Sequence, residues 1–186
     1  MNGLKNKLYI GIDNGVSGAI GFVEASGADL RHTPTIREID YNQKKGKHIT
    51  RLDFLNFKKL MGDKTCWSPP GSPAASPYNP VVVMEYPFKN PMGIDATISG
   101  FRCFEAQLIV LELLEIPRHF ITSQTWQKVL LPEMSKALKG PARKRALKSA
   151  SADVGCRLFP HLADAIKKQK DADALLIAEW ARRQGL

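Results

Sequence analysis

Three acidic residues stand where the surrounding sequence is apolar. Asp13 follows one apolar run, Glu85 ends a second run that begins at Val81, and Asp173 shares the apolar stripe of a helical pattern near the end of the chain. Carboxylates that lie close together raise one another's pKa and resist ionising together, and a divalent cation relieves that repulsion. If the three converge, the pattern indicates an all-oxygen Mg²⁺ or Mn²⁺ site. The alternative is that each carboxylate has its own lysine, arginine or backbone N–H partner.

Apolar patterning predicts the elements that would position these acids. It predicts strands at residues 8–13, 18–24, 30–39, 81–85 and 118–121, the first two joined by a tight Gly/Asn turn. It predicts helices at 101–115, 141–158 and about 172–183, and two more helices that Thr50 and Ser123 would cap at their N-termini. Strands gather early and helices late, with parallel crossovers near 81–85, so the predicted class is α/β.

Length and composition favour one domain over residues 1–186. The chain has 186 residues, 44% hydrophobic and 24% charged, and its Pro-rich stretch at 62–80 is predicted to be an irregular insertion. No apolar stretch approaches the length of a membrane span, and the N-terminal residues do not have a signal-peptide pattern. Cys66, Cys103 and Cys156 have no CxxC spacing, which favours free thiols in a reducing cytoplasm. The chain has no Walker-type motif, so no nucleotide cofactor is predicted.

The basic excess is concentrated in the last third of the chain. The net charge is +9, and residues 118–186 hold 14 of the 27 basic side chains but 6 of the 18 acidic ones. A positive charge concentrated in this way favours binding to a polyanion. The alternative is that these side chains form an ordinary solvated surface. The side chains predicted to contact the phosphates of such a polyanion are Lys136, Lys139, Arg143, Lys144, Arg145, Lys148, Lys167, Lys168 and Lys170. Trp126 is interpreted either as a core residue or as facing the same partner.

Three segments carry a resemblance to a known family. Residues 11–21 (GIDNGVSGAIG) resemble the first hairpin of the RNase H-like superfamily, and residues 82–85 (VVME) resemble its second acidic strand. Residues 170–178 (KDADALLIA) resemble the closing helix of the RuvC-like Holliday junction resolvases of bacteria and their phages. The resemblance implies an RNase H-like fold, with a mixed central sheet of about five strands flanked by helices.

The resemblance also implies a set of metal ligands. Asp13, Glu85 and Asp173 match three of the family's four metal-binding acids. The fourth usually lies three residues before the last, where this chain has Lys170, and the nearest acid is Asp171. Positions two apart do not share a face of a helix, so Asp171 could join the site if it lies at the non-helical N-cap. The other interpretation is that Asp171 only caps the helix.

The implied function is resolution of four-way DNA junctions by paired symmetric nicks in the cytoplasm of a bacterium or a phage-infected host. Two Mg²⁺ ions per site (Mn²⁺ as a substitute) would be bridged by Asp13, with Glu85 on one ion and Asp173, with or without Asp171, on the other. Two alternatives remain: another RNase H-like nuclease, acting on RNA:DNA hybrids, or a non-catalytic DNA-binding protein with a degenerate acid cluster, which Lys170 suggests.

Two further expectations concern the junction. The family places a stacking aromatic three residues after the strand glutamate, a position that Phe88 occupies, with Lys89 and Met92 in the same loop; the alternative is that Phe88 covers the core. The near two-fold symmetry of a junction calls for a homodimer. The predicted helix 101–115 is the candidate interface, because its residues 108–114 are apolar almost all round. Charging Leu111 or Leu114 is therefore expected to give monomers.

Overall fold

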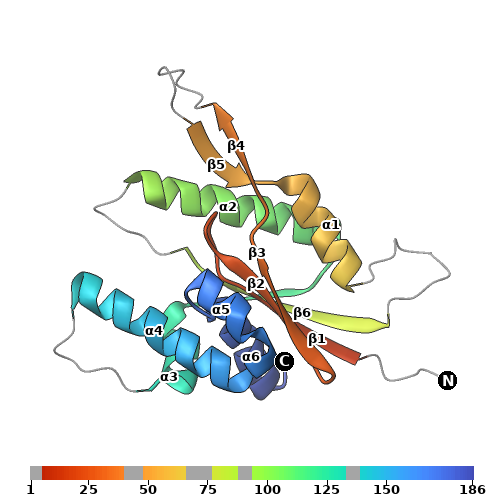
Figure 1. The fold of residues 1–186 in the computed structure, drawn as a ribbon. Coiled ribbons are helices and arrows are strands. Elements are labelled where there is room, and N and C mark those ends of the chain that lie inside the picture. The colour runs from red at the N-terminus through yellow and green to blue at the C-terminus, as the bar shows by residue number, and fades with distance from the viewer. Residues whose placement is uncertain (1–5, 40–47, 66–76, 88–93, 133–138) are drawn as a thin grey trace.

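The computed structural model describes residues 6–39, 48–65, 77–87, 94–132 and 139–186, and its centre is a mixed sheet of five strands (Figure 1). The strand order is β3-β2-β1-β6-β7. Its strands are β1 (Asn6–Ile12), β2 (Ala19–Glu24), β3 (Gly27–His32), β6 (Tyr78–Glu85) and β7 (Arg118–Ile121). β1, β2 and β3 pair antiparallel, whereas β1, β6 and β7 pair parallel. The predicted α/β class and the mixed sheet of about five strands are confirmed.

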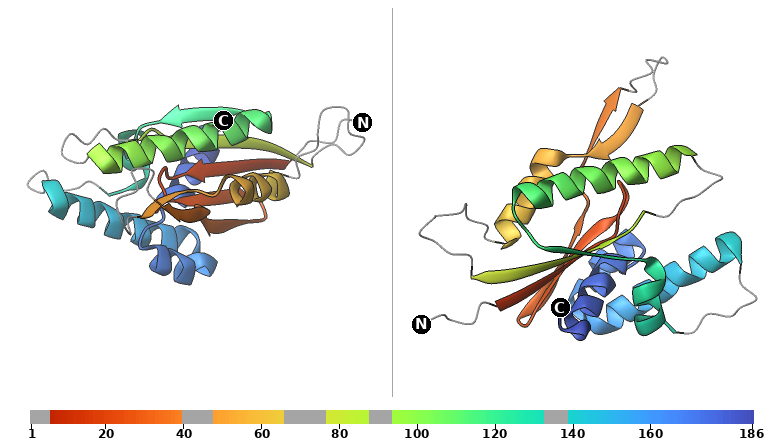
Figure 2. Two further views of the ribbon diagram at one scale, coloured as in Figure 1. Left: turned by 90° about the horizontal axis from the view of Figure 1, so that it is seen from above. Right: turned by 180° about the vertical axis from the view of Figure 1, so that it is seen from behind.

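Helices cover both faces of this sheet (Figures 1 and 2). They are α1 (Phe54–Thr65), α2 (Ile94–Leu113), α3 (Ser123–Leu130), α4 (Gly140–Leu158), the short 3-10 helix η1 (Pro160–Leu162), α5 (Ala163–Gln169) and α6 (Asp173–Gln184). α1 and α2 lie on one face, and α3, α4, α5 and α6 lie on the other. No helix in the described part of the chain is long and apolar enough to cross a membrane.

Strand alternation divides the core into two layers. On β6, Val81 and Val83 belong to the buried cluster under α6, and Val82 and Met84 belong to the cluster under α2. Successive side chains of a strand point to opposite faces, so a strand buried on both faces is apolar throughout. The next residue in this alternation, Glu85, consequently lies on the α6 face of the sheet.

α6 packs unusually close to the sheet because two glycines lie beneath it. Gly11 of β1 and Gly21 of β2 are directly opposite each other in the antiparallel pair. A Cβ on Gly11 would stand 2.1 Å from the backbone oxygen of Ala174, and one on Gly21 would stand 2.6 Å from backbone atoms of the same turn of α6. The absent side chains therefore allow the first turns of α6 to rest on the backbone of β1 and β2.

Two of the predicted strand and helix boundaries were wrong near the hairpin β4 (Thr35–Ile39) and β5 (His48–Leu52). The predicted strand 30–39 is divided at Thr33 and Pro34, and its second half pairs with β5 in a separate two-stranded sheet. Thr50 lies within β5 and caps no helix. α1 begins later, where the Asp53 side chain accepts the backbone N–H of Asn56 at 3.0 Å.

Other predicted segments are corrected in length. The insertion predicted at 62–80 contributes its first four residues to α1 and its last three to β6, while 66–76 lie outside the described residues. The helix predicted at 101–115 begins at Ile94. α3 starts at Ser123, but the N-cap position is Thr122, and no side chain caps the helix there. α5 and η1 were not predicted at all.

The two faces of α2 have different environments. Leu111 and Leu114 are buried in the core of this chain, so a charge at either position would disrupt the fold rather than an interface, and the choice of these two residues was wrong. The exposed apolar side chains of α2 lie on the opposite side of the helix, at Ile94, Ile98, Phe101, Ile109 and Leu113.

Candidate active site

Asp13 and Glu85 lie side by side at one edge of the sheet. They follow the paired residues Ile12 and Met84 at the carboxyl ends of the adjacent parallel strands β1 and β6. Strand alternation turns both side chains to the face that α6 covers. The sequence prediction that each of these acids ends a buried strand is consistent with this register, which also makes the two strands neighbours.

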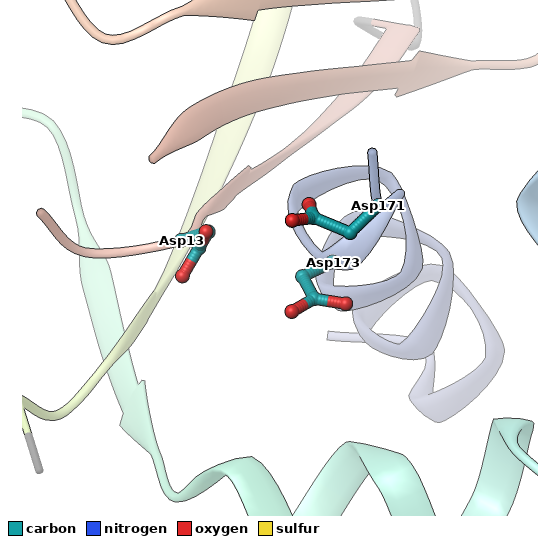
Figure 3. A group of neighbouring side chains, drawn as sticks. All are labelled: Asp13, Asp171 and Asp173. Atoms are coloured by element: carbon teal, nitrogen blue, oxygen red, sulfur yellow. The ribbon is translucent and has the colours of Figure 1, made fainter. Parts of the chain in front are cut away.

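Asp171 and Asp173 approach from the start of α6 (Figure 3). Oxygens of Asp13, Asp171 and Asp173 all lie within 4.8 Å of one another. α5 ends at Lys170, which has a left-handed backbone with φ of 74°, and Ala172 occupies the N-cap position of α6. Because Asp171 and Ala172 precede the helix, residues two apart can present their carboxylates to one spot. The interpretation of Asp171 as the N-cap of α6 was wrong.

Burial and mutual repulsion raise the pKa values of Asp13 and Asp173. Burial raises the pKa of Asp13 well above its ordinary value, and the neighbouring carboxylates of Asp173, Glu85 and Asp171 raise it further. Burial, followed by the charge of Asp171, raises the pKa of Asp173 to about 7. A divalent cation would replace the protons of these acids as the neutralising charge.

Two supporting side chains were not identified from the sequence. The Ser151 hydroxyl of α4 donates to Asp173 and accepts the backbone N–H of Ala172 at 3.1 Å, so one side chain holds the start of α6. Trp126 of α3 is fully buried, as the core interpretation expected, and its Nε1–H donates to Oε2 of Glu85 at 2.9 Å. Burial raises the pKa of Glu85, and this hydrogen bond opposes the rise. The small buried residues of α4 were the available signal for a close approach at Ser151.

Lys148 was expected to contact DNA, and it lies at the acid cluster. Its Nζ is 2.5 Å from Oδ2 of Asp171, whose side chain is only 2% exposed. The second oxygen of Asp171, Oδ1, is buried without a hydrogen-bond partner among the described residues. Within that part of the chain, Asp13, Glu85 and Asp173 form no ion pair with a lysine or arginine. Converging carboxylates with an unpartnered buried oxygen fit a hard divalent cation.

The other basic residues predicted to bind DNA lie in two exposed segments of the chain. Exposed side chains precede or begin α4 at Lys139, Arg143, Lys144 and Arg145, and others lie on or after α5 at Lys167, Lys168 and Lys170. No acidic partner is described for these seven. The remaining predicted DNA contacts, Phe88, Lys89, Met92 and Lys136, lie outside the described residues.

Comparison with known proteins gives a likeness of fold. No family model and no curated protein sequence matches the chain. The structure of Thermus thermophilus RuvC in complex with a Holliday junction substrate is similar, with 14% identity, 96% of each chain covered and a TM-score of 0.51. A second T. thermophilus RuvC structure has 13% identity, the same coverage and a TM-score of 0.47. The first likeness confirms the fold expected from the three sequence segments: the chain has the RNase H-like fold of the RuvC Holliday junction resolvase structures.

Proposed function

We propose that this chain is a Mg²⁺-dependent, structure-selective endonuclease that resolves four-way DNA junctions by paired symmetric nicks. The observation that supports this most directly is the meeting of Asp13, Asp171 and Asp173, with Glu85 beside them, at one edge of a RuvC-like sheet. A similar structure is a RuvC bound to a Holliday junction. The proposed place of action is the cytoplasm of a bacterium or of a phage-infected host.

The four carboxylates divide naturally between two cations. Two bound Mg²⁺ ions (or Mn²⁺) would supply an activated water and stabilise the attacking and leaving oxygens of phosphodiester hydrolysis. Asp13 would help to hold both ions, because the charges of Glu85, Asp171 and Asp173 all act on it. Glu85 would hold one ion, and Asp171 with Asp173 would hold the other. Trp126 and Ser151 orient Glu85 and Asp173 for this task.

The basic surfaces would supply affinity for the DNA backbone. Lys139 and the three basic residues at 143–145 lie exposed at the start of α4, and Lys167, Lys168 and Lys170 lie exposed on or just after α5, in the segment that leads to Asp171. Phosphate contacts of this kind bind without sequence preference, and junction affinity should fall steeply as salt rises. Phe88, Lys89, Met92 and Lys136 complete the proposed set of DNA contacts.

A homodimer would match the two-fold symmetry of the junction. A stripe on the side of α2 opposite the core exposes apolar side chains at Ile94, Ile98, Phe101, Ile109 and Leu113. The exposed acids Glu105 and Glu112 lie on the same side of the helix. A stripe of this kind is typical of an interaction surface. We propose that a second copy of the chain covers it, which would place two active sites on one junction.

The test is a cleavage assay with three synthetic substrates, namely a four-way junction, a linear duplex and an RNA:DNA hybrid, each with Mg²⁺ or with EDTA. Symmetric nicks in the junction that require Mg²⁺ support the proposal. Cutting of the hybrid would instead favour another RNase H-like nuclease, and junction binding without cutting would favour a non-catalytic protein.

Asp13→Asn should abolish junction cleavage and leave junction binding intact, because the basic surfaces are unchanged. Asp164→Asn is the matched control, since Asp164 is an exposed acid of α5 outside the cluster. Cleavage at the unchanged rate by Asp13→Asn would refute the assignment of the site.

A further inference from the structure

We propose that Lys148 is an internal substitute for one metal ion. In the ion-free protein its ammonium group neutralises Asp171, and it releases Asp171 when a divalent cation binds, so that Lys148 sets the affinity of the site for the ion. This inference rests on the proposed metal-dependent function. It assigns to Lys148 a positioning role at the carboxylate, distinct from a simple contribution to the DNA-binding surface.

The two partners of this ion pair differ in their freedom to move. The Asp171 side chain is 2% exposed, whereas that of Lys148 is 46% exposed. Asp171 is held next to Ala172, whose backbone N–H is bound by Ser151. Lys148 can therefore withdraw its ammonium group into solvent by rotating its flexible stem, while the carboxylate stays in place.

The ion pair neutralises the cluster incompletely. One positive charge lies 2.5 Å from Oδ2 of Asp171, while Asp13 and Asp173 contribute oxygens within 4.8 Å of the same group. Oδ1 of Asp171 has no described hydrogen-bond partner. A buried carboxylate oxygen without a partner is costly, so the site retains a strong attraction for a cation of higher charge.

Lys148 and a bound ion would compete for the same carboxylate. An ion held among these oxygens would lie a few ångströms from the ammonium group, and like charges at that separation repel each other. Loading the ion would move the ammonium group outward from the acid cluster and into solvent, to which the Lys148 side chain is already 46% exposed. Removing the lysine charge should consequently tighten ion binding and destabilise the ion-free protein.

The experiment measures Mn²⁺ affinity by calorimetry and thermal stability in EDTA, on the full chain without DNA. Lys148→Met should bind Mn²⁺ at least about tenfold more tightly, which corresponds to about 1.4 kcal/mol, and should have a lower Tm in EDTA. Lys148→Arg keeps the charge and should stay close to the unchanged protein in both. The matched control is Lys128→Met, because Lys128 is an exposed lysine of α3 with no ion pair in the described structure.

The opposite signs of the two effects separate this role from a merely structural one, which would weaken stability and ion binding together. Unchanged or weaker Mn²⁺ binding by Lys148→Met overturns the inference, as does equal tightening by Lys128→Met. In an Asp171→Asn background the effect of Lys148→Met on affinity should vanish, and its persistence would also overturn the inference. Absence of Mn²⁺ binding in the unchanged protein and in every variant would instead refute the metal site of the proposed function, and the inference with it.

Discussion

Substituting Gly11 by alanine tests whether the close contact between β1 and α6 assembles the acid cluster. The new Cβ would lie 2.1 Å from the backbone oxygen of Ala174, about 1.3 Å short of ordinary contact at 3.4 Å. The obstructing atom belongs to the backbone of a helix, so no side-chain rotation can relieve the overlap. α6 must move away from the sheet and carry Asp173 away from Asp13.

Two magnitudes follow from this displacement. Overpacking of a well-packed core costs about 1–3 kcal/mol of unfolding free energy, which exceeds the gain of about 0.4–1 kcal/mol that alanine brings by restricting the unfolded chain. A misplacement of about 1 Å at a catalytic centre can lower the rate about a hundredfold. We therefore expect Gly11→Ala to weaken Mn²⁺ binding and reduce junction cleavage by about two orders of magnitude.

The assay compares chemical denaturation, Mn²⁺ calorimetry and junction cleavage for Gly11→Ala and Gly27→Ala. A Cβ on Gly27 of β3 would meet nothing within 4 Å, so this control should be neutral or slightly stabilising. If Gly11→Ala keeps the unfolding free energy and the Mn²⁺ affinity of the unchanged protein, the close contact does not position the cluster and the reasoning is refuted.

Three other predictions concern charge, support and assembly. In EDTA the Tm should fall as pH rises from 5 to 8, because the pKa values of Asp13 and Asp173 are raised, that of Asp173 to about 7. Over this range the folded protein keeps protons on these two acids that the unfolded chain has already released, so rising pH favours unfolding. Saturating Mg²⁺ should offset the fall. Trp126→Phe should weaken Mn²⁺ binding about tenfold by calorimetry, because the phenyl ring fills much of the site but cannot donate to Glu85. Ile109→Glu should convert a dimer into a 20.6 kDa monomer, measured by light scattering after size-exclusion chromatography.

Each of these has a decisive contrary result. A Tm in EDTA that rises over the same pH range would contradict the raised pKa values of the acid cluster. Unchanged Mn²⁺ affinity in Trp126→Phe would show that the indole hydrogen bond does not orient Glu85. For assembly, the control is Val129→Glu, since Val129 is 53% exposed on α3, which covers the other face of the sheet. A dimer that survives Ile109→Glu would exclude this face of α2.

The central strands and their acids could be predicted because their signals are local. A strand buried on both faces is apolar throughout, so the acid that ends it is conspicuous, and this identified Asp13 and Glu85. The same reasoning missed a signal at Pro34, which lies inside the predicted strand 30–39. Proline has no N–H to donate to a sheet, and the structure begins a new hairpin just after it.

The contacts between distant segments could not be predicted from periodicity. Whether Asp171 turns towards Asp173 depends on where α5 ends, and the left-handed backbone of Lys170 that ends it follows a seven-residue helix with little pattern of its own. The hydrogen bonds from Trp126 and Ser151 join segments 41 and 22 residues apart in the chain. Such pairings are created by packing and leave no spacing in the sequence.

The acid cluster combines the first strand of the sheet with the last helix of the fold, and this has a consequence for synthesis. A chain still emerging from the ribosome carries Asp13 and Glu85 long before residues 171–173 exist, and these two carboxylates alone are half of the acid cluster. Any reaction that needs all of these carboxylates therefore cannot begin in the growing chain until α6 has docked onto β1.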